Sequence, residues 1–246
     1  MQADASSSSP RSFEWWMISN LAVGAGFSAF VALLIPPYVT EVTGSAAEAG
    51  VIMAVMSLAA VLGPVLGGLA DRYRAHRLTM SVGIFAMAFA FAAFALAADS
   101  STFFPIDAVI MGVGVAAVSA VAPAYIVGAG LDKKMEASQL TTFNLVAPVG
   151  QVLGGALLGA AAAAGMSYSD RFWISAGVLL VAGLLTWFTS GKATKRLHAQ
   201  LYASTEGGDG DALDSASPAA AANESTAAAK PKGLSSVLLS TFGVYL

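Results

Sequence analysis

A charged segment that separates two long apolar stretches holds the residues best suited to chemistry in this chain. It reads Gly67-Gly-Leu-Ala-Asp71-Arg72-Tyr-Arg-Ala-His-Arg77. A carboxylate between the end of one helix and the start of the next can interact with the positive end of a helix dipole and with nearby cations. The segment therefore predicts an electrostatic contact between helix ends, and its arginines also help to set the orientation of the chain in a membrane.

Polar side chains inside one apolar stretch recur on a single helical face. Asn144, Pro148, Gln151 and Gly155 follow one another at spacings of four, three and four residues. Amide groups at membrane depth point to a partner helix or to a wet cavity, not to lipid. This face therefore predicts either part of a substrate cavity or a set of hydrogen bonds between helices.

The sequence argues against an enzyme. Its only histidines, His76 and His198, lie in different polar segments far from each other, and there is no His-Glu-x-x-His motif or pair of intramembrane aspartates. No Gly-rich ATP-binding loop with a lysine occurs. Cysteine is absent, which excludes disulfides and cysteine-bound metals. We expect no catalytic residue, no metal site, no cofactor and no nucleic-acid partner.

Composition identifies the elements that carry these residues as membrane helices. The chain has 246 residues, of which 57% are hydrophobic and 11% charged, with a mean hydropathy of +0.71. Several apolar runs reach the roughly 20 residues that cross a bilayer as a helix. Six spans are expected, at residues 14–39, 48–70, 78–98, 104–130, 139–165 and 171–191. We expect Pro36-Pro37 to end or kink the first span, because proline lacks an amide N–H.

The basic residues predict the orientation of these spans. Eleven of the 12 Lys and Arg residues precede span 1, follow span 6, or lie between spans 2 and 3 or 4 and 5, and Arg171 is the exception. By the positive-inside rule both termini are cytoplasmic. An even number of spans requires both ends on one side, and a cysteine-free chain suits a bacterial inner membrane.

The chain divides into four parts by composition. Residues 1–13 are predicted as a cytoplasmic tail and residues 14–191 as the bundle of spans. Residues 192–233 are rich in Ala, Ser, Gly and acids and are expected to be a disordered cytoplasmic linker. Residues 234–246 are apolar but too short to span, so they are expected to be the start of a seventh helix or an interfacial helix.

The charged segment resembles the signature loop between transmembrane helices 2 and 3 of the major facilitator superfamily. Arg74 and Ala75 depart from that pattern, where the family prefers Gly and Arg. The resemblance implies that the aspartate docks on a helix of the other half-carrier, while the arginine pairs with an acid near the cytoplasmic end of helix 4, here Asp132. We therefore predict a conformational latch. Its residues are Gly67, Asp71, Arg72, Arg77 and Asp132.

The same resemblance implies an all-α membrane fold of six transmembrane helices in two inverted three-helix repeats. If spans 1–3 and 4–6 form these repeats, spans 2 and 5 are equivalent, and the glycine pairs Gly63/Gly67 and Gly150/Gly154 give both of them a smooth face for close helix crossing. In this architecture helices 1, 2, 4 and 5 line the central cavity, and a cavity poor in charge favours an uncharged or lipophilic solute. The predicted cavity residues are Asn20, Ser28, Ser119, Tyr125, Asn144 and Gln151.

One ionisable residue, Asp107, lies about one turn inside the outer end of span 4. It is either a proton carrier or an interfacial residue that faces water. The arginine that proton-coupled exporters of the superfamily place in helix 4 is missing here, so proton coupling is not supported by its usual residues.

These observations predict half of a secondary transporter that works by alternating access. Its expected partners are membrane lipid, a small-molecule substrate and a second six-helix half, either a homologous chain or an identical one. The alternative is a non-transporting six-span scaffold or a degenerate half-carrier.

Overall fold

The computed structural model describes residues 13–97 and 101–206, with side chains up to residue 200, and all of the secondary structure in them is helical. The elements are η1 (Trp15–Met17), α1 (Ile18–Val23), the π-helix η2 (Gly24–Val31), α2 (Ala32–Thr43), α3 (Ala46–Ala60), α4 (Gly63–Tyr73), α5 (His76–Leu96), η3 (Ser101–Phe103), α6 (Phe104–Val121), α7 (Ala124–Val127), α8 (Lys133–Ala163), α9 (Tyr168–Thr189) and α10 (Gly191–Glu206).

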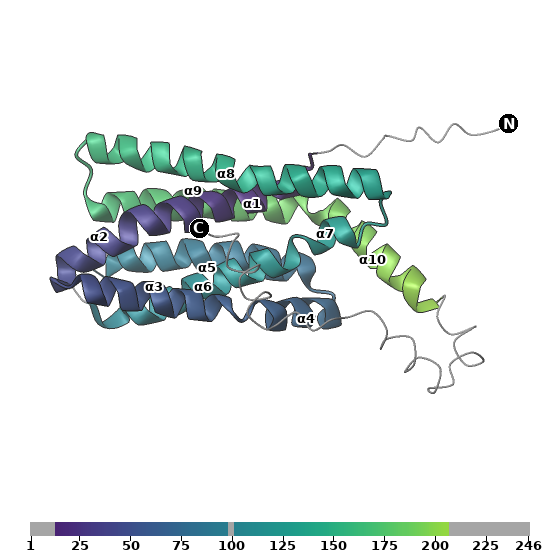
Figure 1. The fold of residues 1–246 in the computed structure, drawn as a ribbon, viewed down its shortest axis with the longest axis horizontal. Helices are drawn as coiled ribbons and strands as arrows, with labels where there is room; N and C mark the ends of the chain where they lie inside the picture. The colour runs from purple at the N-terminus through teal and green to yellow at the C-terminus, as the bar shows by residue number, and fades with distance from the viewer. Residues whose placement is uncertain (1–12, 98–100, 207–246) are drawn as a thin grey trace, which may run out of the picture. The chain divides into compact units, whose positions relative to one another are not determined.

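Six helical stretches among the described residues are long and apolar enough to cross a membrane, as the sequence predicts. They are Trp15–Thr43, Ala46–Tyr73, His76–Leu96, Ser101–Val127, Lys133–Ala163 and Tyr168–Thr189. They pack side by side in one bundle (Figure 1). The α4–α5 turn, α7 and the start of α10 lie at the end of the bundle that we call the basic end. The α2–α3 junction, η3 and the α8–α9 turn lie at the other, which we call the acidic end.

The first and fifth spans differ from their predicted limits. Helix α2 runs through Pro36 and Pro37 to Thr43, so the helix does not end at the prolines. Neighbouring helices and side-chain hydroxyls compensate for missing backbone donors in membrane helices, and the π-helix η2 directly before α2 already departs from α-helical bonding. Helix α8 begins at Lys133, not at 139, because the Asp132 carboxylate caps it.

Two close helix crossings show the repeat relation in the packing. A Cβ atom on Gly150 of α8 would collide with the carbonyl of Leu21 in α1, where span 5 crosses span 1. A Cβ atom on Gly112 of α6 would collide with the carbonyl of Met56 in α3, where span 4 crosses span 2. Spans 1 and 4, and spans 2 and 5, are equivalent members of inverted three-helix repeats. The fold is therefore the predicted all-α bundle, with matching contacts in its two halves.

Aromatic rings join four spans at the acidic end. The Phe172 ring of α9 stacks on Phe94 of α5 with centroids 5.5 Å apart and meets Tyr38 of α2 at 5.0 Å. Phe104 of α6 completes the group, 5.3 Å from Phe94 and 5.7 Å from Tyr38. Such pairs add to the stabilisation from burial alone, so this cluster holds spans 1, 3, 4 and 6 together.

Helix α10 contradicts the prediction of a disordered linker from residue 192. Ala193 and Leu197, one turn apart, are 1% and 3% exposed and pack against the core of the bundle. An apolar stripe at this spacing stabilises a helix once a partner surface covers it. The linker prediction is therefore wrong for residues 192–206. Residues 207–233, the apolar segment 234–246 and tail residues 1–12 lie outside the described residues.

Candidate functional site

A groove at the basic end brings together several residues singled out in the sequence. It has a volume of about 430 Å³ and lies between spans 2 and 4. A Cβ atom on Gly67 would lie 3.5 Å from the Ala120 methyl group, so a larger residue at position 67 would narrow the groove. The predicted latch residues Gly67 and Asp71 thus lie beside the predicted cavity residue Ser119. The lining residues are Ala60, Gly63, Pro64, Gly67, Gly68, Asp71, Ala116, Ser119 and Ala120.

The carboxylate of Asp71 is held by one contact and otherwise open. Its Oδ1 lies 2.8 Å from Nε2 of His76. Because a carboxylate only accepts hydrogen bonds, the histidine Nε2 must be the donor. The Asp71 side chain is 68% exposed, whereas the His76 side chain is 1% exposed. The histidine therefore positions a carboxylate that remains free to meet another surface.

The two arginines of the predicted latch, Arg72 and Arg77, have different surroundings. The guanidinium of Arg77 donates to the Trp187 carbonyl at 2.9 Å and lies 4.3 Å from the centre of that indole, which ties α5 to α9. Arg72 is exposed and lies 5.7 Å from the ring of its neighbour Tyr73. Arg77 therefore has a structural contact inside this bundle, while Arg72 faces outward.

The predicted Arg72–Asp132 pair is not formed in this structure. Asp132 instead caps α8, with its Oδ1 accepting from the Met135 amide at 2.6 Å. Within the described ranges, the salt bridges join His76 to Asp71 and Arg196 to Glu14. The Arg72–Asp132 ion pair of the latch therefore stays a prediction, for a conformation other than this one.

Four of the predicted cavity residues lie on spans 1 and 5. Asn144 and Gln151 are exposed on α8 and lie on an uncovered face of the bundle. Asn20 is half-buried, and its Nδ2 donates to the Phe143 carbonyl at 2.6 Å, so this residue joins span 1 to span 5. Ser28 is half-buried within the π-helix η2. Asn20 therefore makes a hydrogen bond between helices, which was one of the two alternatives that the sequence left open. The side-chain amides of Asn144 and Gln151 remain accessible.

Tyr125 does not belong to this cavity, which corrects the sequence prediction. Its side chain is 1% exposed, beneath α10 at the basic end. The hydroxyl group lies 3.0 Å from Oγ1 of Thr194, and the ring packs on Trp16 with centroids 5.1 Å apart. Because α10 was not predicted, its cover over Tyr125 could not be foreseen.

Residues 16–244 match the family model of the Major Facilitator Superfamily, from the first span to beyond the sixth. The chain belongs to the major facilitator superfamily. Neither a curated protein nor a solved structure matches it. Members of the superfamily are membrane transporters and not enzymes, so this facilitator is a multi-pass membrane protein of a transporter family, and the sequence resemblance is confirmed.

Asp107 of this facilitator is buried, so of the two alternatives that the sequence left open, the one in which it faces water is wrong. It lies in the first turn of α6 and is 5% exposed. Its Oδ2 atom is buried and has no hydrogen-bond partner within the described residues. A role as proton carrier stays a prediction.

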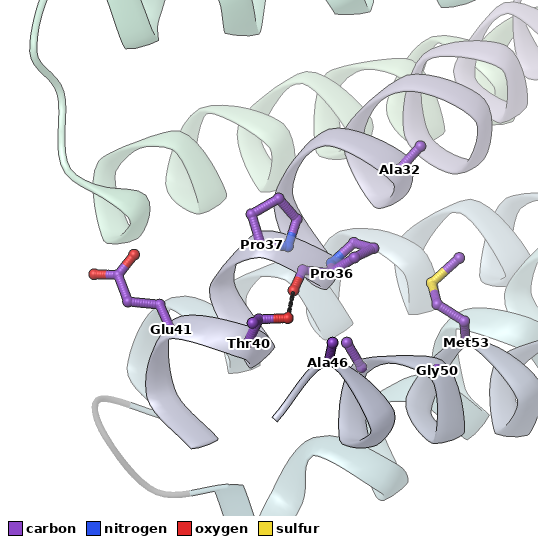
Figure 2. Close-up of a pocket in the computed structure, with 9 residues that line it drawn as sticks. Ala32, Pro36, Pro37, Thr40, Glu41, Ala46, Gly50 and Met53 are labelled. Atoms are coloured by element: carbon purple, nitrogen blue, oxygen red, sulfur yellow. Dashed lines mark hydrogen bonds between the residues drawn. The ribbon is translucent and has the colours of Figure 1, made fainter. Parts of the chain in front are cut away.

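A second groove lies at the acidic end between α2 and α3, and the sequence analysis did not predict it. Its volume is about 620 Å³. Figure 2 shows the Glu41 carboxylate toward one side of it and the Met53 thioether toward the other. The Thr40 hydroxyl donates to the Pro36 carbonyl at 2.8 Å. The signal in the sequence that could have indicated this groove is the Pro36-Pro37 pair, with Thr40 three residues later. The lining residues are Ala32, Pro36, Pro37, Thr40, Glu41, Ala46, Ala49, Gly50 and Met53.

Proposed function

We propose that this facilitator is one half of a secondary transporter that moves a small uncharged or lipophilic solute by alternating access. The substrate path lies between its spans 1, 2, 4 and 5 and a second six-helix half. Binding sites in such carriers lie near the bilayer midplane at an interface between repeats. The second half is a homologous chain or a second copy of this one.

The observation that carries the proposal is the unequal burial of the spans. Within their most apolar windows, 28% of span Ala46–Tyr73 and 22% of span Lys133–Ala163 are buried, against 61% of span Ser101–Val127. The two uncovered spans are the second and the fifth, which are equivalent in the two repeats. A pair of equivalent open faces is what a second bundle would cover.

The chemistry of these faces supports a protein partner and a wet path more than lipid alone. Exposed amides of Asn144 and Gln151 and the exposed hydroxyl of Ser119 lie among apolar side chains. Polar groups at membrane depth gain from facing a protein or a water-filled cavity. None of these three side chains is charged, and the charged side chain that lines the groove with Ser119 is the predicted latch residue Asp71, so the proposed path favours solutes that are uncharged or lipophilic.

The decisive experiment is purification from the native membrane, mass determination and a flux assay in liposomes. We expect the chain to co-purify with a second six-helix half and to show no vectorial transport without it, since one half alone leaves the path open on one side. A lone monomer that moves substrate would contradict the half-carrier proposal. A stable monomer with no flux and no partner would favour the alternative, a non-transporting scaffold or a degenerate half-carrier.

We also propose that the basic end faces the cytoplasm, in a bacterial inner membrane. Because the chain has no cysteine, single cysteines report their own exposure. Ser45→Cys and Ser169→Cys, at the acidic end, are expected to react with a membrane-impermeant thiol reagent added outside intact cells. Lys133→Cys, at the basic end, is the control and should react only after the membrane is opened. The reverse labelling pattern would overturn this orientation.

A further inference from the structure

The two histidines of the chain meet at the basic end, although the sequence predicts that they lie far apart. His76 is the first residue of α5, and His198 lies in α10. Their ring centroids are 5.8 Å apart, in an edge-on arrangement. The sequence expectation is wrong because the contact exists only where α10 docks on the bundle, and α10 itself was not expected.

Each ring buries one nitrogen without a partner. Nδ1 of His76 and Nε2 of His198 are buried and make no hydrogen bond within the described residues. The other nitrogen of His76 donates to Asp71, so a neutral His76 ring leaves only a lone pair on Nδ1.

Charged and titratable groups of both signs lie around the pair. The His76 ring also lies 6.3 Å from the ring of Tyr125, which is itself bonded to Thr194 of α10. The one carboxylate in contact with the pair, among the described residues, is the largely exposed Asp71. The Glu14 carboxylate, further along the same surface, is paired with Arg196. The charged and titratable groups that lie near the pair are Asp71 and Arg74 from the α4–α5 turn and Tyr125 from α7, and Arg77 from α5 acts on Tyr125.

We propose that the His76–His198 contact is a pH-sensitive lock, which holds α10 on the basic end while the His198 ring is neutral and releases it when the surrounding solution becomes acidic. The lock is a regulatory contact in addition to transport, and it does not depend on the half-carrier proposal.

The direction of the pH effect follows from His198. Burial lowers the pKa of His198 from its ordinary value of 6.5, and the charges of His76 and Arg74 act in the same direction. The released helix therefore binds more protons than the docked one. Docking is at full strength above pH 6.5 and weakens as the pH falls through that value toward the lower pKa of the docked state.

Release would reach the groove at the basic end through direct contacts. When α10 leaves, the Thr194 hydroxyl leaves Tyr125, and His76 loses the ring that covers it. His76 is the residue that positions the Asp71 carboxylate. The lock therefore connects the acidity of the solution at the basic end to the orientation of the signature-loop aspartate.

The test measures docking of α10 on the full chain in lipid nanodiscs. Ala193→Cys places a thiol on the buried face of α10, and Ala199→Cys places one on its exposed face. The quantity measured is the reaction rate of the thiol at position 193 divided by that of the thiol at position 199, with a small water-soluble thiol reagent. Both rates depend on thiol ionisation in the same way, so this dependence drops out of the ratio. We expect this ratio to rise several-fold between about pH 7.5 and about pH 5.5, on either side of the ordinary histidine pKa.

His198→Gln is the matched control, since glutamine is polar and cannot take up a proton in this range. In that background the ratio should stay low and flat. A second readout needs no cysteine: trypsin cleavage after Lys195, compared at each pH between the native chain and His198→Gln, should become faster in the native chain upon acidification. A flat ratio in the native background, a rise that persists in His198→Gln, or a fall in acid would each overturn the proposal, whatever the flux assay shows.

Discussion

Gly150→Ala is expected to destabilise the bundle by about 1–3 kcal/mol, the range for overpacking a tight core. The new methyl group would collide with the backbone carbonyl of Leu21. A backbone atom cannot rotate away as a side chain can, so α1 and α8 would have to separate. Unfolding in detergent micelles with increasing SDS content, followed by tryptophan fluorescence, measures the loss.

Gly159→Ala is the matched control on the same helix. A Cβ atom on Gly159 meets nothing within 4 Å, and alanine is a better helix former than glycine by roughly 0.5–1 kcal/mol. This variant should be as stable as the native chain or slightly more so. Equal losses for the two variants would mean that the close crossing of spans 1 and 5 is not a determinant of stability.

Asp71→Asn is expected to lower transport by the assembled carrier roughly ten- to a hundredfold, since a hydrogen bond to a charged group is worth about 1.5–3 kcal/mol. The asparagine oxygen can still accept from His76, so the local fold is kept while the charge is lost. The measurement is the initial rate of flux in liposomes, with the amount of inserted protein determined in parallel.

Two further variants separate the latch from a general effect of charge. Asp132→Asn keeps the cap of α8, because asparagine is as good an N-cap as aspartate; a loss of flux would then report the predicted pairing with Arg72. Glu48→Gln removes an exposed charge at the acidic end and should leave the rate unchanged. Native flux in Asp71→Asn would mean that the signature loop only sets the orientation of the chain.

The fold was predictable because a membrane-spanning helix can be recognised from its own residues, without knowledge of its neighbours. Each span is recognised from its own apolar length, and the Gly67–Arg77 loop identifies the family without any long-range contact. The ends of the spans were less predictable. Lys133 and the polar residues after it continue α8 as a helix outside the apolar run because Asp132 caps them, and polarity alone cannot separate such a helix from a loop.

The candidate site was predictable only where a residue acts through its own helix. Asn144 and Gln151 share a helical face by their spacing alone, but spacing does not tell whether that face meets a partner helix or a cavity. Tyr125 and the pair of histidines depend on α10, whose buried stripe consists of little more than Ala193 and Leu197 in an alanine-rich sequence. So short a stripe does not identify a docked helix until the surface under it is known.

The length of α8 sets the level of the bilayer on this protein. At 1.5 Å per residue its 31 residues extend about 46 Å, whereas a hydrocarbon layer is about 30 Å thick. Its polar first ten or so residues account for the excess, which places the hydrocarbon boundary near Phe143, whose ring lies 5.8 Å from that of Trp16 at the start of span 1. A thicker membrane would have to submerge the lysines at the start of α8 or thin locally, and a thinner one would have to tilt the helix. Bilayer thickness therefore acts on this facilitator through α8, the helix that carries Asn144 and Gln151.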